Sequence, residues 1–292
     1  MHFDAHAAAY ASARPPYPPA LWQRLRELGV LRPRRRALDL GAGTGQATGP
    51  LLDAGVEVTA VEPGTRLAAR LRHAHPEATV LVTRAEDLDL PDATFDTVVA
   101  ATSIHWLDLD VVLPKVHRLL VPGGIFLVWR NVFGDPAVET QFRDRLADIV
   151  RARGDRQVPR TDTESWESTA AELTSSGLFF AEEASTYRWR MTLDEEQVRK
   201  LFTTFSDWSE DEVDQAARAV RELGGQVDEH YQSWLIVLRR WATPTPEMQE
   251  ARMPASSAGF RAAGLAGVPG LEPRTTVPET AVLPITPYPN GP

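Results

Sequence analysis

The run ALDLGAGTG, residues 37–45, leads an apolar strand directly into three glycines placed at every second position. Such a turn exposes bare backbone to a ligand. A Cβ on Gly41 or Gly43 would stand where the ligand must approach, and glycine tolerates the backbone angles that a tight turn needs. A dinucleotide fingerprint would place its third glycine three residues after the second, where this chain has Gln46. The spacing therefore predicts a nucleotide pocket and disfavours a dinucleotide one.

The composition is that of an ordinary globular domain, with 43% hydrophobic residues among 292, enough to build a core. The formal net charge of -9 argues against nucleic acid as the main partner, because phosphate binding draws on clustered Lys and Arg. The chain has no cysteine, which excludes disulfides, thiolate metal sites and cysteine nucleophiles. The histidines show no ligand spacing backed by carboxylates, so we predict no metal.

Membrane and export signals are missing from the sequence pattern. No apolar run reaches the roughly 18 residues of a membrane span. The first residues lack the basic start and apolar core of a signal peptide. We therefore expect a cytoplasmic protein without a membrane partner.

From residue 37 onward, predicted strands alternate with predicted helices. The strands are expected at 37–40, 56–61, 78–82, 97–101 and 124–129, and the helices at 46–54, 65–73 and 111–120. Strands rich in Val, Leu and Ile between helices are typical of a parallel sheet covered on both faces. Further strands at 184–191 and 234–240 would add antiparallel pairs, giving a doubly wound α/β fold with a mostly parallel, seven-stranded sheet.

The remaining segments divide the chain into three parts. Residues 1–19 are expected to form a Pro-rich arm, and residues 20–242 the main domain, with helices expected at 20–28 and 136–153 and a helical cap insertion at about 192–224. The aromatic residues Phe202, Phe205 and Trp208 of that insertion are expected mainly in a core; if the insertion caps the active site, they would instead shape an apolar acceptor cavity. Residues 243–292 are rich in proline and lack a periodic apolar face, so we expect a disordered tail.

Acidic and backbone groups follow the ends of three predicted strands, the edge at which open α/β sheets bind ligands. Glu62 ends the second strand, where its carboxylate could accept both hydroxyls of a ribose. Ala85 and Glu86 follow the third strand and could read the edge of an adenine ring. Ala101 and Thr102 end the fourth strand beside the glycine turn, and their backbone could hold the charged end of a methionine moiety.

These segments, in this order, resemble the small-molecule type 11 family of class I S-adenosylmethionine (SAM) dependent methyltransferases. The resemblance is carried by LDLGAGTG at 38–45, VEP at 61–63, AEDL at 85–88, FD at 95–96 and VPGG at 121–124. It implies a Rossmann-like fold, SAM as cofactor, S-adenosylhomocysteine (SAH) as product and no metal. The implied cofactor-binding residues are Asp39, Gly41, Ala42, Gly43, Glu62, Ala85, Glu86, Ala101 and Thr102.

Two further segments are similar to the trans-aconitate methyltransferase subgroup: YASARPPYP at 10–18 and IHW at 104–106. In that subgroup the arm closes over the cofactor. The resemblance implies Tyr10, Arg14 and Tyr17 as lid or substrate contacts, although a plain loop before the first helix is the alternative. Trp106 and Asn131 are further candidates for the acceptor side. Relatives often show Trp-Asn at the end of the fifth strand, whereas here Arg130 intervenes.

His105 is the candidate general base, because imidazole titrates near neutral pH and the residue follows the fourth strand. The alternative is that His105 and Trp106 only form a wall of the pocket. Methyl transfer from SAM is an in-line displacement in which alignment supplies much of the rate, so a base is optional.

The sequence thus favours a SAM-dependent methyltransferase acting on a small carboxylate-bearing or apolar acceptor, as a monomer or homodimer. A SAM-binding lyase or cyclase that does not methylate is the main alternative. A nicotinamide-dependent oxidoreductase conflicts with Gln46. A non-enzymatic interaction protein would leave the glycine turn and Glu62 unexplained.

Overall fold

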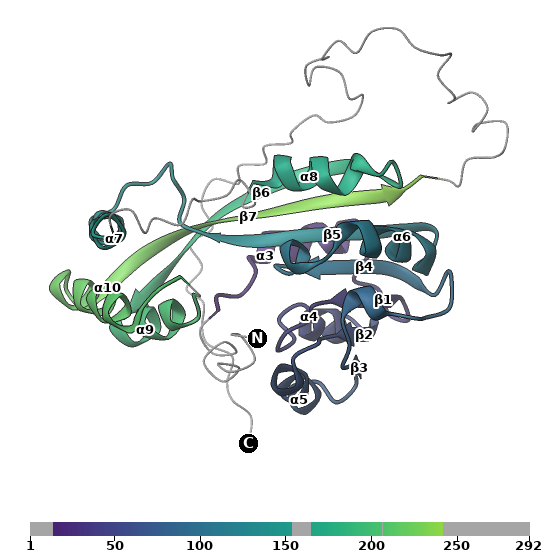
Figure 1. Ribbon diagram of the computed structural model, residues 1–292, viewed down its shortest axis with the longest axis horizontal. Coiled ribbons are helices and arrows are strands. Elements are labelled where there is room, and N and C mark those ends of the chain that lie inside the picture. Colours follow the sequence, from purple (N-terminus) through teal and green to yellow (C-terminus); the bar gives the residue numbers. More distant parts are fainter. Residues whose placement is uncertain (1–13, 154–164, 206, 242–292) are drawn as a thin grey trace, which may run out of the picture.

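One seven-stranded sheet organises the chain (Figure 1). The computed structural model describes residues 14–153, 165–205 and 207–241; Tyr10 and the 243–292 tail lie outside the described residues. The strands are β1 (Arg36–Leu40), β2 (Glu57–Val61), β3 (Thr79–Leu81), β4 (Phe95–Ala101), β5 (Leu120–Phe133), β6 (Phe179–Asp194) and β7 (Gln226–Arg240). Their order is β3-β2-β1-β4-β5-β7-β6. Strand β7 is antiparallel to β5 and β6, and the other pairs are parallel, which confirms the mostly parallel sheet.

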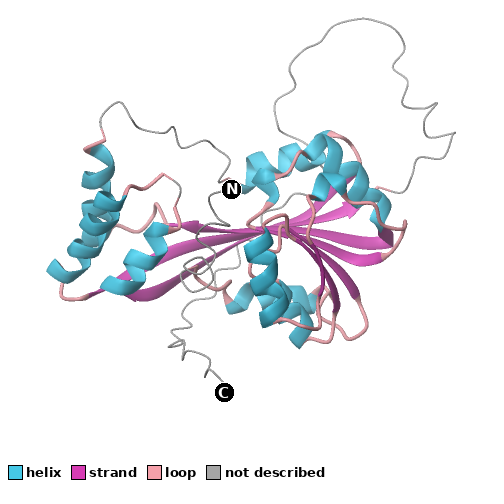
Figure 2. Cartoon of the chain, turned by 60° about the horizontal axis from the view of Figure 1, so that its bottom comes forward, coloured by secondary structure: helices cyan, strands magenta, loops and turns pink. Residues whose placement is uncertain are grey.

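Helices cover both faces of this sheet, and Figure 2 shows the strands as a twisted layer between them. On one face, helices α3 (Pro19–Glu27) and α4 (Thr48–Asp53) pack Leu21, Leu25 and Leu51 against the strands. On the other, α6 (Leu109–Leu119) and α8 (Trp166–Ser175) form a second buried cluster. Helix α5 (Thr65–Ala74) packs Leu71 against Ala60 and Ala42. The doubly wound arrangement is therefore observed.

Several elements differ from expectation. Strands β5, β6 and β7 are longer than the strands expected at 124–129, 184–191 and 234–240. The helix expected at 136–153 is α7 (Gln141–Arg151), which begins where the Thr140 side chain accepts a hydrogen bond from the Arg143 amide. The residues before it form a turn in which Asp135 accepts the amides of Ala137 and Val138. Helix α8 was not predicted, because it buries little more than Ala170 and Leu173 and therefore lacks a strong apolar pattern.

The long strands β5, β6 and β7 extend past the parallel strands and carry a helical cap (Figure 1). Helices α9 (Glu195–Thr203) and α10 (Glu210–Glu222) connect β6 to β7, and each begins with a capping box. Helix α7 joins them in a separate core whose largest members are Phe142 and Phe202. A capping box satisfies backbone amides at the helix start, which fixes where each cap helix begins. The cap thus stands beside the carboxyl ends of the central strands.

Candidate functional site

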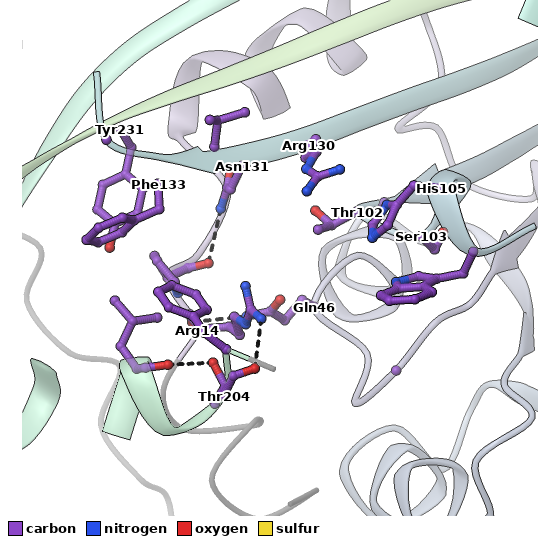
Figure 3. Close-up of a pocket in the computed structure, with 18 of the residues that line it drawn as sticks. Arg14, Gln46, Thr102, Ser103, His105, Arg130, Asn131, Phe133, Thr204 and Tyr231 are labelled. Carbon is purple, nitrogen blue, oxygen red and sulfur yellow. Dashed lines mark hydrogen bonds between the residues drawn. The ribbon is translucent and has the colours of Figure 1, made fainter. Parts of the chain in front are cut away.

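A cavity of about 1850 Å³ extends from the glycine turn to the cap. Small-molecule sites usually measure about 300–1,000 Å³, so this space can hold a nucleoside together with a second ligand. Its wall includes the carboxyl ends of β1, β2 and β4, the arm residues from Arg14, the end of β5, and parts of α7 and α9. Figure 3 shows the middle of the cavity and the cap end.

Contacts with neighbouring protein residues help to explain why this turn requires glycine. Gly41, Gly43 and Gly45 all have left-handed φ angles, of 67°, 59° and 97°. A Cβ on Gly41 would stand 2.7 Å from Cβ of Ser103, whose hydroxyl donates to the carbonyl of Leu40 at 2.5 Å. At Gly41 the missing side chain therefore admits the β4 loop, whereas the sequence had suggested the ligand alone. Ala42 follows β1 and donates its amide to Val61 of β2.

Glu62 joins the glycine turn to the end of β2. Its Oε2 accepts the Gly43 amide at 2.9 Å, and its Oε1 accepts the Gly64 amide at 2.7 Å. The residue is only 6% exposed, yet it lines the cavity. The two amides therefore orient a buried carboxylate at the glycine-turn end of the cavity, where the sequence predicts a ribose.

Asp39 is a second buried carboxylate on the same wall. Its Oδ2 accepts the Thr48 hydroxyl at 2.7 Å, while Oδ1 has no hydrogen-bond partner among the described residues. Burial raises the pKa of Asp39 to about 7; the Thr48 hydrogen bond opposes the rise and the nearby charge of Glu62 adds to it. An unpaired buried oxygen of this kind calls for a donor from a ligand.

The predicted adenine contacts lie on the short 3-10 helix η1 (Ala85–Asp87). Ala85 is buried and Glu86 lines the cavity. The Glu86 carboxylate also accepts the Asp108 amide at 3.0 Å and pairs with Arg84 at 3.3 Å. These hydrogen bonds lower the pKa of Glu86 although burial acts in the opposite direction. Glu86 thus fixes the loop after β3 to the loop before α6.

The end of β4 is bent sharply at Thr102, which has a left-handed φ of 58°. Its amide donates a hydrogen bond to the Trp129 carbonyl at 2.7 Å, so this donor is already occupied by a contact within the protein. Thr102 and Ala101 both line the cavity beside the glycine turn. Unusual backbone angles in a non-glycine residue are concentrated at functional sites, which makes this bend part of the candidate site.

Arg14 connects the glycine-turn end of the cavity to the cap. Its Nη2 donates to the Thr204 carbonyl at 3.3 Å, and its guanidinium lies 5.0 Å from the ring centre of Phe205. In the opposite direction its carbonyl accepts Nε2 of Gln46 at 3.1 Å (Figure 3). One arm residue therefore contacts both the turn before α4 and the end of α9.

Tyr17 and Asn131 anchor the arm. Asn131 donates its side-chain amide to the carbonyls of Pro15 and Pro16, each at 3.3 Å, and accepts the Ser233 hydroxyl at 2.6 Å. The Tyr17 hydroxyl lies 3.0 Å from Oγ1 of Thr102, and its buried ring packs edge-on against Trp129. The Asn131 side chain is thus directed to the arm backbone, whereas the sequence had suggested the acceptor.

His105 and Trp106 lie on the 3-10 helix η2 (Ile104–Trp106) at the cavity wall, their ring centres 4.8 Å apart. Trp106 is 62% exposed. Loss of surrounding water and the positive charges of Arg130 and Arg14 lower the pKa of His105, to about 3. The imidazole is exposed to the cavity. The ring is neutral at pH 7 and a weaker base than a free imidazole.

Residues that the sequence did not single out form the cap end of the cavity. Phe133 of β5 lies opposite Tyr231 of β7, with ring centres 5.6 Å apart. Arg143 of α7 lies 4.8 Å from the ring centre of Phe133 and 3.1 Å from the fully buried Glu229. Burial raises the pKa of Glu229 to about 7, and Arg143 opposes the rise. Only the register of β5 and β7 brings these residues together, and no short motif encodes it.

The described residues offer neither a metal centre nor a membrane span. Within residues 14–153, 165–205 and 207–241, no group of three or more His, Asp and Glu side chains could hold a metal ion. In the same part of the chain, every helix is too short or too polar to cross a membrane.

Residues 38–128 match the profile of a methyltransferase domain family. An uncharacterized methyltransferase of Mycobacterium tuberculosis (strain ATCC 25618 / H37Rv) is 39% identical over 132 residues, which are 45% of this chain and 53% of that protein. One from Synechocystis sp. (strain ATCC 27184 / PCC 6803 / Kazusa) is 34% identical over 100 residues, 33% of this chain and 47% of that protein. The matched region thus spans about half the length of these relatives.

A solved structure from Anaeromyxobacter dehalogenans, assigned as a type II methyltransferase, superposes with a TM-score of 0.60 and 26% identity. It covers 78% of this chain and 97% of that one. The chain therefore has the Rossmann-like fold of the methyltransferases, and its residues 38–128 are similar to a methyltransferase domain.

Proposed function

We propose that this protein transfers a methyl group from SAM to a small-molecule acceptor by in-line displacement. The observation that carries the proposal is Glu62, which the amides of Gly43 and Gly64 hold at the cavity wall next to the glycine turn. A carboxylate in this position can accept ribose hydroxyls. The methyltransferase-domain match over residues 38–128 supports the same interpretation.

SAM fits the charges of this wall. Oδ1 of Asp39 is buried without a partner among the described residues, and an ammonium group is a donor that would satisfy it. We assign Glu62 to the ribose, Ala85 and Glu86 to the adenine, and Asp39, Ala101 and Thr102 to the methionine end, next to the glycine turn of Gly41, Ala42 and Gly43. When bound, SAM supplies an electrophilic methyl group on a positively charged sulfur.

The chain's own residues then bind and orient the two reactants and cover the site. The Arg14–Gln46 and Asn131–Pro15 contacts fix residues 14 and 15 at the cavity. We assign this segment the role of the arm that closes over the cofactor in the trans-aconitate methyltransferase subgroup. His105 lies on the same wall as Thr102 and is assigned to orient the acceptor atom and take up its proton. Alignment of the two reactants is assigned the larger part of the rate.

The protonation of His105 gives a test that needs no acceptor. We expect the ring to stay neutral down to about pH 5, because burial and two arginines disfavour the imidazolium. Ring proton and carbon shifts in an NMR titration would show this, with His105→Gln identifying the signal. A midpoint near the ordinary histidine value would contradict the expectation.

Asp39→Asn should change stability and ligand affinity in opposite directions. The folded pKa of Asp39 is raised, from 3.8 to about 7, so its contribution to stability falls as pH rises through that window and is lowest above it. We expect the Asp39→Asn variant to be more stable than wild type by about 1–3 kcal/mol near pH 8, with a smaller advantage near pH 5 and none below about pH 4. Urea unfolding at both pH values would measure this.

The same substitution removes the charge assigned to the ligand ammonium, so SAH binding should weaken by about tenfold or more. Calorimetry gives the affinity. Unchanged SAH affinity in Asp39→Asn would remove the assigned role of this carboxylate, whatever its effect on stability.

Methyl transfer itself is tested by incubating the full chain with methyl-labelled SAM and a metabolite extract, followed by mass spectrometry. We expect a labelled low-molecular-weight product that is missing when Glu62→Ala replaces the wild type. Turnover of SAM without any methylated product would favour a lyase or cyclase instead.

A further inference from the structure

Tyr231 presents an unused polar group at the cap end of the cavity. The residue is 2% exposed and lines the cavity, and its hydroxyl has no hydrogen-bond partner among the described residues. Buried tyrosine hydroxyls usually find a partner, because the phenol loses its water on burial. A hydrogen bond to a ligand would supply the partner that the protein does not.

This hydroxyl lies far from the predicted methyl-transfer end. The Thr102 amide binds the Trp129 carbonyl, which places Trp129 level with the end of β4. Phe133, opposite Tyr231, is four residues further along β5 (133 minus 129), a distance of about 13 Å in an extended strand. In Figure 3, Tyr231 and Phe133 stand at one end of the view, and His105 and Ser103 at the other.

Aromatic rings line the cavity at the Tyr231 end. The ring centre of Phe133 lies 5.6 Å from that of Phe205 and 5.2 Å from that of Phe202, in both cases edge to face. All three rings line the cavity. Rings at such angles offer flat and edge surfaces to another ring, so a planar apolar group of a ligand can pack against them beside Tyr231.

Charges of both signs surround Tyr231. Glu229 lies two residues away on the same side of β7, is fully buried and lies 3.1 Å from Nε of Arg143. The charge of Glu229 acts on the Tyr231 hydroxyl in one direction, and the charges of Arg14 and Arg143 act in the other. A neutral carbonyl, ether or phenol oxygen would accept the hydrogen bond without adding a further charge to this group.

We propose that the acceptor is an elongated, flat, aromatic molecule, and that its oxygen remote from the methylated atom accepts a hydrogen bond from Tyr231. This inference rests on the proposed methyl transfer, because it places the reacting atom beside His105. It makes Tyr231 a specificity-determining residue, and it selects an apolar acceptor over a small diacid.

Fluorescence titrations with stilbene and 4-hydroxystilbene test the proposal, since the two probes differ by one oxygen. Wild-type protein saturated with SAH should bind 4-hydroxystilbene more tightly than stilbene. Tyr231→Phe keeps the ring and removes the hydroxyl. It should weaken only the hydroxylated probe, by about 3- to 10-fold. Tyr187→Phe, at a buried tyrosine of the sheet core, is the control and should leave both probes unchanged.

The proposal is overturned if the full chain binds neither stilbene, if succinate competes with them, or if Tyr231→Phe weakens both probes equally. The titrations are repeated without SAH, so that the binding of the two stilbenes can still be interpreted if SAH does not bind. A failure to bind SAH with normal stilbene discrimination would contradict the proposed function and support the aromatic site.

Discussion

Replacing Glu62 with alanine is expected to weaken SAH binding by about 100-fold or more, because two hydrogen bonds to a charged group contribute about 1.5–3 kcal/mol each. The carboxylate is oriented by the amides of Gly43 and Gly64, so the site loses a preformed acceptor as well as a charge. Isothermal calorimetry on the full chain measures the change.

Glu57→Ala is the matched control, since Glu57 begins the same strand, β2, and is exposed. It should bind SAH like the wild type. Glu62→Gln keeps the side-chain shape and should lie between the two, and thermal unfolding without ligand separates lost binding from lost folding. If Glu62→Ala binds SAH as tightly as Glu57→Ala, Glu62 has no part in the ribose site.

Gly41→Ala should lower the free energy of unfolding by about 3 kcal/mol, since it combines left-handed strain of about 1–2 kcal/mol with overpacking of about 1–3 kcal/mol. The new Cβ would stand 2.7 Å from Cβ of Ser103. We also expect SAH affinity to fall at least about tenfold, because the turn must move to relieve this contact. Urea unfolding and calorimetry measure the two effects.

Gly123→Ala separates the two causes, because Gly123 has a similar φ of 78° but nothing within 4 Å of the position that a Cβ would take. It should cost about 1–2 kcal/mol. In a double-mutant cycle, Ser103→Gly should recover about 1–2 kcal/mol in the Gly41→Ala background. Equal losses for Gly41→Ala and Gly123→Ala would show that the contact with Ser103 is unimportant.

The half of the fold that contains the glycine turn could be predicted from the sequence, because the patterns that indicate it are local. The glycine spacing, the acidic residue after β2 and the alternation of strands with helices each lie within a few residues of one another. The helical insertion expected at about 192–224 is observed as α9 and α10, and the structure shows that the capping residues Asp194 and Ser209 fix where these helices begin.

The arm anchors and the cap end of the cavity were not readable, since they depend on contacts between distant residues. Asn131 reaches Pro15 and Pro16, and Phe133 meets Tyr231 only through the register of β5 and β7. Gly41 was assigned to the ligand because the sequence gives no sign that Ser103 would pack against it. Tyr10, predicted as a lid contact, lies outside the described residues and stays a prediction.

The central claim is that the glycine turn, Asp39 and Glu62 form a SAM site. Calorimetric titration of the full chain with SAM, SAH and NADH tests it most directly. We predict micromolar affinity for SAM and SAH and no binding of NADH. Binding of NADH with no heat from SAM or SAH would contradict the account.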